Sequence, residues 1–265
     1  MKKYLLIIFV FVFACSSINF VRRKKLVDVT FIEKFKTQSK IDKCIYDKFS
    51  KNYYLKHDNK IAIYSDKKLI NQIGGTGFKR SNFNKLSDIC FSPENNLITL
   101  DSFSQQIKKF DKSGSYLRSF SLNNASEPIL ITIDDQNITF IFDAQTNEIL
   151  VYKDINKKPS NRFGKFSIIK PTSIDIVFDK LIVSSKERTL VFSKIGYLLN
   201  EFDEKIVFDN YENKLFLNNY KLQSLDDNLN LFLSNIPFHS DIKICDLNLL
   251  FYNEKEVARY GIIYE

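Results

Sequence analysis

Short apolar runs alternate with turn residues along most of this chain. Between Leu86 and Phe120 the runs ICF, LITL, IKKF and YLRSF are separated by SPENN, DSFSQ and DKSG. Apolar runs of this length, broken by Pro, Asn, Asp and Gly, are typical of antiparallel strands joined by tight turns. A helical period of 3.6 residues is absent over any useful length. The stretch therefore predicts a four-stranded meander of about 35 residues.

This four-strand unit recurs along the chain. FDKSGSYLRSF (110–120) matches FSKIGYLLNEF (192–202), with Gly114 and Gly196 at the same offset. Gly suits a hairpin turn because it accepts positive φ without a Cβ penalty. NITFIFDAQTNEILVY (137–152) repeats NLITLDSFSQQIKKF (96–110), with Asp143 and Asp101 at equivalent places. The copies recur at about 41 residues, which matches the period of propeller blades.

Weaker copies fill the rest of the chain. Residues 42–75 and 205–237 each contain four apolar runs, whereas residues 241–265 contain three. LVDVTFIEKF (26–35) alternates and belongs to no copy, so it can complete the last blade and close a ring. The sequence therefore predicts an all-β chain that forms a six-bladed β-propeller. Its blades are four-stranded and antiparallel, and the N-terminal strand closes the ring; seven or five blades are the alternatives.

The repeat also resembles a known family. The stretch from Ile73 to Gly114 is similar to an NHL-type repeat, which has a Gly-rich turn, a Phe, an apolar strand ending in Asp, the pattern I-x-x-F and a turn Gly. The residues at these places are Gly74, Gly75, Gly77, Phe83, Asp101, Ile107, Phe110 and Gly114. The chain departs from the family at Leu86, where Pro is usual, and blades five and six lack the turn glycine. The resemblance implies a six-bladed propeller lipoprotein of bacteria.

The N-terminus has the pattern of an export signal. Two lysines precede an unbroken apolar run that ends in VFAC, and about ten apolar residues are too few for a spanning helix. Ala14 before Cys15 resembles the lipobox of bacterial lipoproteins, which implies lipid attachment at Cys15; an uncleaved anchor is the alternative. The predicted organisation is a signal peptide (1–14), a lipidated tether (15–25) and a β-propeller (26–265).

This organisation predicts a location outside the cytoplasm. The chain would be lipid-anchored in the bacterial cell envelope, and the same resemblance favours the outer membrane because Ser16 follows the cysteine. The basic run RRKK (22–25) could contact anionic headgroups, although a solvated tether is the simpler interpretation. The formal net charge of +8 permits a glycan or other polyanion as a ligand. Export argues against nucleic acid as a partner.

Composition supports one all-β domain. The 265 residues include 44% hydrophobic residues and 25 phenylalanines, which are ample for cores between blades. Only 7 glycines are present, so Asn and Asp are expected to take many turn positions. Cys44, Cys90 and Cys245 fall in predicted innermost strands, where core thiols are expected and a disulfide is the alternative.

No motif predicts a catalytic or metal centre. Zinc catalytic sites usually need three protein ligands, and the chain has only His57 and His239. Neither histidine lies in a nucleophile elbow. Asp88, Asp134 and Asp175, near the ends of innermost strands, leave a calcium-dependent hydrolase of the lactonase kind open. No cofactor is expected, and enzymatic activity stays an open question that leans towards none.

Binding is therefore the leading functional hypothesis. We expect a membrane-tethered, extracytoplasmic propeller that acts as a non-enzymatic protein-binding or scaffold module with an envelope protein as partner. The first alternative is a glycan- or small-ligand-binding lipoprotein, in which aromatic rings at the channel mouth stack on the ligand: Tyr46, Tyr53, Tyr54 and Phe91. The second is the calcium-dependent hydrolase. The ligand, the binding face and the oligomeric state do not follow from the sequence.

Overall fold

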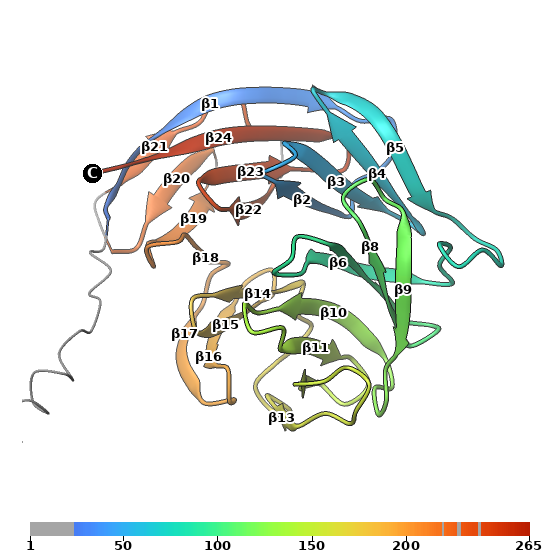
Figure 1. Cartoon of the computed structure of the whole chain (residues 1–265). Helices are drawn as coiled ribbons and strands as arrows, with labels where there is room; N and C mark the ends of the chain where they lie inside the picture. Colours follow the sequence, from blue (N-terminus) through green and yellow to red (C-terminus); the bar gives the residue numbers. More distant parts are fainter. Residues whose placement is uncertain (1–23, 219, 227–228, 238–239) are drawn as a thin grey trace, which may run out of the picture.

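The computed structural model describes residues 24–218, 220–226, 229–237 and 240–265, which form six four-stranded antiparallel sheets around one axis (Figure 1). The described residues contain no helix, and so none that is long and apolar enough to cross a bilayer. The all-β, six-bladed fold predicted from the repeat is confirmed.

Five blades are consecutive meanders, each with its first strand next to the central channel (Figure 1). Blade 1 has β2 (Lys43–Asp47), β3 (Asn52–His57), β4 (Lys60–Ser65) and β5 (Lys68–Gly74), and blade 2 has β6 (Leu86–Phe91), β7 (Leu97–Asp101), β8 (Gln106–Phe110) and β9 (Tyr116–Ser121). Blade 3 has β10 (Pro128–Ile133), β11 (Thr139–Asp143), β12 (Glu148–Tyr152) and β13 (Asn161–Phe163). Blade 4 has β14 (Ser173–Val177), β15 (Lys180–Ser184), β16 (Thr189–Ser193) and β17 (Leu198–Phe202), and blade 5 has β18 (Val207–Phe208), β19 (Lys214–Asn218), β20 (Lys221–Ser224) and β21 (Asn230–Phe232).

Blade 6 closes the ring with strands from both ends of the chain. It contains β22 (Asp241–Cys245), β23 (Asn248–Tyr252), β24 (Glu256–Tyr264) and, outermost, β1 (Leu26–Lys36). The strands β1 and β24 pair antiparallel from Leu26↔Tyr264 to Lys36↔Glu256, and Figure 1 shows them side by side. The predicted role of residues 26–35 as the closing strand is confirmed.

A polar network reinforces this closure. Glu33 on β1 accepts hydrogen bonds from Arg259 on β24, at 2.7 Å from Nη2 and 3.0 Å from Nε, and from the Tyr53 hydroxyl of blade 1 at 2.6 Å. The Arg259 guanidinium also lies 4.7 Å from the centroid of the Tyr46 ring, at cation–π distance. One carboxylate therefore ties the first strand, the last strand and blade 1 together.

The meander gives the ring two different faces. The entrance face carries the connections between successive blades and the hairpins between second and third strands. The turn face carries the hairpins between first and second and between third and fourth strands. Gly114 and Gly196 lie in such turns with φ of 90° and 101°. Asn95 and Asn137 also adopt positive φ there, as the Gly-poor composition predicted.

The aspartate that marks each clear repeat has a structural role. Asp101, at the end of β7, is fully buried and accepts backbone hydrogen bonds from residues 84, 85 and 104. Asp143, one blade later, accepts equivalent bonds from residues 126, 127, 145 and 146. Each carboxylate thus fixes the loop that enters its own blade and the hairpin that follows it, because buried N–H groups need acceptors.

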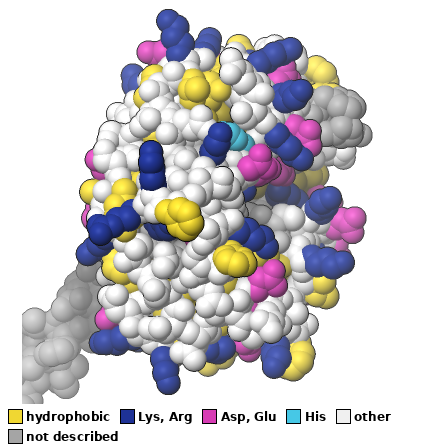
Figure 2. All heavy atoms as spheres, turned by 90° about the vertical axis from the view of Figure 1, so that its right-hand side faces the viewer, with side chains coloured by type: hydrophobic (Ala, Val, Ile, Leu, Met, Phe, Trp, Pro, Cys, Tyr) yellow, Lys and Arg dark blue, Asp and Glu magenta, His cyan; other side chains and the backbone are white. Residues whose placement is uncertain are grey.

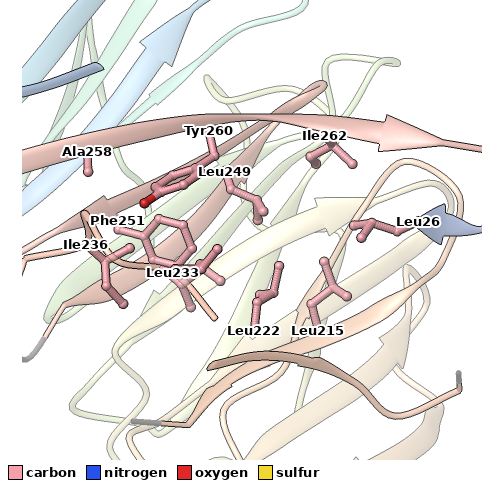
Figure 3. Close-up of a cluster of buried hydrophobic side chains, with 11 residues drawn as sticks. Leu26, Leu215, Leu222, Leu233, Ile236, Leu249, Phe251, Ala258, Tyr260 and Ile262 are labelled. Atoms are coloured by element: carbon pink, nitrogen blue, oxygen red, sulfur yellow. The ribbon is translucent and has the colours of Figure 1, made fainter. Parts of the chain in front are cut away.

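Apolar cores fill the spaces between neighbouring blades. The sheets stand face to face around the axis, so the alternating side chains of a strand point towards the previous and the next blade. Five such cores are present in the described part of the chain, between blades 1 and 2, 2 and 3, 3 and 4, 5 and 6, and 6 and 1. Figure 3 shows the core between blades 5 and 6, where Phe251 and Leu249 of β23 meet Leu215 and Leu222 of blade 5.

Candidate functional site

Three lysine–aspartate pairs cross the channel end of the ring. Lys43 on β2 lies 2.5 Å from Asp88 on β6, and Lys243 on β22 lies 2.9 Å from Asp175 on β14. A third pair joins Lys205, just before β18, to Asp241 at 2.5 Å. Each pair links two different blades. The channel is therefore lined by paired charges of both signs.

Asp88 belongs to the framework of the channel. Its side chain is 1% exposed, and Oδ1 accepts from Lys43 Nζ while Oδ2 accepts from the backbone N–H of Ile131 at 2.9 Å. One carboxylate therefore connects blades 1, 2 and 3. With both oxygens engaged, Asp88 holds the inner strands in register.

The pair between Lys243 and Asp175 is more open. It connects blade 6 with blade 4, on either side of blade 5, and the Asp175 side chain is 39% exposed. Burial by itself would lower the pKa of Lys243, but the Asp175 carboxylate and further negative groups outweigh burial and raise this pKa. The ammonium group therefore stays charged in the channel, where it is paired with Asp175.

A cavity of about 280 Å³ lies beside this pair. It forms where the innermost strand of blade 5, β18, is only 2 residues long, whereas the other innermost strands have 5 or 6. Its lining combines the three lysines with apolar groups such as Ile182, Phe208 and Ile242. We call this space the channel cavity.

The channel cavity opens into a wider basin on the entrance face. This vestibule has a volume of about 860 Å³ and is bordered by Lys186 of blade 4 and by the β23–β24 hairpin, which includes Lys255. The two spaces share Asp42, Asp241 and Tyr252 in their linings. A ligand could thus enter from the entrance face and reach the paired charges.

The aromatic residues predicted as a stacking platform lie elsewhere. Tyr46 and Tyr53 are buried in the core between blades 6 and 1, and Tyr54 and Phe91 belong to the core between blades 1 and 2. The Tyr54 hydroxyl donates to the carbonyl of Lys112 at 2.8 Å, and the Tyr54 and Phe91 rings meet edge to face. We expected these rings at the channel mouth. The structure instead places them between blades, because both sheet faces are covered by neighbours.

The cysteines occupy the predicted innermost strands. Cys44, Cys90 and Cys245 are free thiols, and burial raises the pKa of all three, in Cys90 to about 12. Cys15, the predicted lipid attachment site, lies outside the described residues, as does His239. Because their pKa values are raised, the thiols of Cys44, Cys90 and Cys245 are poor nucleophiles at neutral pH.

The remaining sequence candidates do not converge. Asp134 lies in a turn-face hairpin 2.9 Å from Lys194, far along the strand from the vestibule, and His57 ends β3 on the entrance face without lining the vestibule or the channel cavity. Within the described ranges, no three His, Cys, Asp or Glu side chains gather closely enough to hold a metal ion.

Sequence reasoning missed the lysines that line the channel. Lys43 begins the short apolar strand KCIYD, and Lys243 lies in the middle of the strand DIKIC. A charged residue inside a strand that is covered on both faces must reach solvent at the strand edge, since an unpaired buried charge is costly. A lysine inside a predicted innermost strand is therefore the signal that could have located the channel lining.

Comparisons with known proteins support the fold. No family model matches the sequence, and no curated protein matches it. Virginiamycin B lyase from Staphylococcus aureus is structurally similar, with a TM-score of 0.62 and 11% identity over 89% of this chain and 100% of that one. A streptogramin B lyase gives a TM-score of 0.56 and 14% identity over 83% of this chain and 78% of that one.

A third similar structure matches over only part of its own chain. Raptor from Chaetomium thermophilum gives a TM-score of 0.58 and 13% identity over 92% of this chain and 30% of that one. The identities of 11%, 14% and 13% are too low to carry a functional assignment, so these similarities show the fold alone. The comparisons identify the chain as a six-bladed β-propeller.

Proposed function

We propose that this chain is a membrane-tethered, extracytoplasmic binding module that presents its vestibule to a protein of the cell envelope. One observation carries the proposal: the N-terminal segment joins the ring on the turn face, while the vestibule opens on the entrance face. A tether on one face leaves the opposite face free to meet a partner. In this proposal the propeller is a lipoprotein of the NHL-like type.

The position of the N-terminus follows from strand pairing. Leu26 pairs with Tyr264 at the end of β24, whereas the vestibule borders the hairpin before the start of β24. The strand β24 is 9 residues long, and this separates the two faces by about 30 Å. Lys24 confirms the location, because its carbonyl accepts a hydrogen bond from the Asn213 side chain, at 3.0 Å, in a turn-face hairpin.

The sequence supplies the proposed anchor. Residues 15–25 would connect a lipid on Cys15 to the ring, and eleven residues reach at most roughly 40 Å. The turn face would then stay close to the membrane and the vestibule would point away from it. A single acyl group binds membranes weakly, so the diacylated cysteine implied by the lipobox resemblance is needed for stable attachment.

The entrance face also exposes large apolar side chains. Phe78, Phe103 and Phe166 are 109%, 77% and 93% exposed, and each lies in an entrance-face loop. Aromatic side chains are enriched in protein-binding surfaces, although none of these three lines the vestibule itself. By contrast, Figure 2 shows that on the edge of the ring hydrophobic side chains occur singly among basic and acidic ones. The turn face also exposes large apolar side chains, such as Phe49 and Tyr197, so the position of the vestibule is what favours the entrance face for a partner.

Lyase chemistry has less support from the site. One similar structure is a catalytically inactive His-to-Ala variant of virginiamycin B lyase with quinupristin. Among the described residues of this chain, no histidine lines the channel cavity or the vestibule. A small ligand is the second candidate, because the channel cavity of about 280 Å³ approaches the size of known ligand sites.

Site-specific photo-cross-linking in the native membrane tests the proposal. A photoreactive amino acid replaces Lys186 or Lys255 at the vestibule, and Lys51 or Lys67 on the turn face as matched exposed controls. We expect one envelope protein to be recovered near stoichiometry from the vestibule positions only. Equal recovery of a partner from positions on both faces would contradict the assigned face. If no protein is recovered and a small molecule is found bound to the propeller, the second candidate is established.

The anchor has an independent test. Cys15→Ser should move the chain from the membrane fraction to the soluble extracytoplasmic fraction and abolish labelling by fatty acids. A variant that stays in the membrane would support an uncleaved N-terminal anchor instead. This outcome concerns the tether and leaves the cross-linking result unaffected.

A further inference from the structure

Blades 4 and 5 meet without the apolar core found at the other blade interfaces of the described ring. Polar contacts join them, together with one edge-to-face contact between Phe202 and Phe208, whose ring centroids lie 6.2 Å apart. The Thr189 hydroxyl donates to the carbonyl of Glu204 at 2.9 Å and accepts from the Ile206 N–H at 2.8 Å. An ion pair connects Lys180 of blade 4 to Glu212 of blade 5. This interface is therefore built differently from its neighbours.

The strand register shows which residues are responsible. In blade 3 the pairs Phe140↔Val151 and Phe142↔Ile149 face blade 4 and lie in its core. The corresponding pairs of blade 4, which face blade 5, are Ile182↔Val191 and Ser184↔Thr189. Two phenylalanines and an isoleucine are thus replaced by isoleucine, serine and threonine. Blade 5 compensates little, because its innermost strand has only 2 residues.

The missing volume appears as a cavity. A space of about 190 Å³ lies between the two blades, with an apolar floor of Val177, Ile182, Val191 and Phe208. Four polar residues complete its lining: Lys180, Asn200, Glu212 and Lys214. We call this space the side pocket. It shares Val177, Ile182 and Phe208 with the channel cavity, so the two spaces adjoin.

We propose that the side pocket binds an aromatic or branched aliphatic side chain of a peptide segment whose polar groups occupy the channel cavity. An apolar cavity of about 150 Å³ can hold a benzene molecule, so the side pocket is large enough for a phenyl or leucyl group. Its polar rim suits the peptide backbone next to such a side chain. The adjoining channel cavity offers both ammonium and carboxylate partners to the polar groups.

This inference rests on the binding role proposed above and specifies its ligand class. A glycan could contact the polar lining residues, but it has no apolar group of this size to cover Val177, Ile182 and Val191. A peptide from a partner protein fits both spaces, because one buried aromatic or aliphatic anchor typically dominates such an interface. The apolar part of the side pocket therefore favours a peptide ligand over a sugar.

Capped amino acids are suitable probes. The full chain in lipid nanodiscs is titrated with N-acetyl-phenylalaninamide, N-acetyl-leucinamide and N-acetyl-glycinamide, and with N-acetylglucosamine as the sugar control. Binding is measured by saturation-transfer NMR and by the shift in Tm. We expect the phenylalanine and leucine amides to bind about tenfold or more tightly than the glycine amide, because only they bury apolar surface. The sugar should not compete with them.

Variants at one position locate the binding. Val191→Phe fills the side pocket, and Val191→Leu replaces it if the larger side chain is not tolerated. Either variant should lower the affinity for the phenylalanine amide about tenfold or more while the ring stays folded. The matched control is Val151→Leu, at the equivalent place in blade 3, where Val151 is buried in the core between blades 3 and 4. That control should lower Tm yet keep the full response to the amide.

Two results would overturn the inference. One is equal binding of the phenylalanine and glycine amides, and the other is undiminished binding to a folded Val191 variant. The outcome is distinguishable from failure of the proposed function. Amide binding without a cross-linked partner would retain the side pocket and refute the envelope-protein role, whereas a cross-linked partner without amide binding would do the reverse.

Discussion

Replacing Glu33 by alanine should weaken the closure of the ring more than the loss of any exposed ion pair. Glu33 is the shared acceptor for Arg259 on the last strand and for the Tyr53 hydroxyl in blade 1. Its side chain is 14% exposed and that of Arg259 is 16% exposed. Alanine would leave a largely buried guanidinium and a buried hydroxyl without this acceptor.

The magnitude follows from what is left unpaired. Hydrogen bonds to charged groups contribute about 1.5–3 kcal/mol, and breaking a fully buried ion pair costs about 3–5 kcal/mol. Because both side chains keep some access to water, the Coulombic part is partly screened. We therefore expect Glu33→Ala to lower the free energy of unfolding by about 2–3 kcal/mol at pH 7. For a domain of this size that corresponds to roughly 5–10 °C in Tm.

Equilibrium denaturation of the full chain in detergent measures this effect. The matched control is Glu254→Ala, which removes a pair with Lys40 whose side chains are 69% and 63% exposed; such pairs contribute about 0–1 kcal/mol. Equal losses in the two variants would refute a special role for Glu33 in closing the ring. A loss below about 0.5 kcal/mol for Glu33→Ala would refute it as well.

The same pair has a pH dependence. Burial would raise the pKa of Glu33, but hydrogen bonds from Tyr53 and Arg259 and the charge of Arg259 outweigh it and lower this pKa. A lowered folded-state pKa adds stability above the unfolded value of about 4.3, and this stability is lost as the pH falls through the folded value. The difference between wild type and Glu33→Gln should thus be full at pH 7 and shrink in acid. A difference independent of pH would contradict this account.

Three further predictions concern the blades. Gly114→Ala should lower Tm by several degrees, because φ is +90° and a Cβ would lie 2.6 Å from Ile73. The control Gly261→Ala, whose Cβ would have no contact below 3.4 Å, should change Tm little. Equal shifts in Tm for the two variants would contradict this prediction. Asp143→Ala should cost about 2–4 kcal/mol, measured by chemical denaturation, because it releases four backbone N–H groups. The Cys90 thiol should resist maleimide at pH 8 in the folded protein and react after unfolding, since burial raises its pKa to about 12. Mass spectrometry of the labelled protein measures this, and labelling of Cys90 in the folded state would contradict the prediction.

Much of the fold could be predicted because each blade encodes it locally. Asp101 and Gly114 mark a hairpin and a loop that the backbone requires, so their spacing indicated the repeat and its period. The closing strand was predictable because Leu26 to Lys36 alternates and belongs to no other blade. These features need no knowledge of how one blade meets the next.

The lining of the channel could not be predicted in the same way. Strand alternation divides side chains between two sheet faces, but in a ring of stacked sheets both faces are covered by neighbours. Tyr53 and Tyr54 point in opposite directions and are both buried, one in each adjoining core. The channel is lined instead by edges of innermost strands and by lysines long enough to reach past them. Their position depends on how far each innermost strand lies from the central axis, which is a property of the assembled ring.

The candidate site lies at the interface between blades 4 and 5, which is also the interface that lacks an apolar core. The short strand β18 and the polar substitutions Ser184 and Thr189 remove the core that would join blades 4 and 5. An apolar contact of several large side chains stabilises a fold by several kcal/mol, so its loss is costly unless something else favours it. Here the loss creates the channel cavity and the side pocket together, on the path from the vestibule. A cavity of about 330 Å³ also lies between blades 2 and 3, but there an apolar core joins the two blades, so only the interface between blades 4 and 5 combines open space with the loss of its core in the described ring.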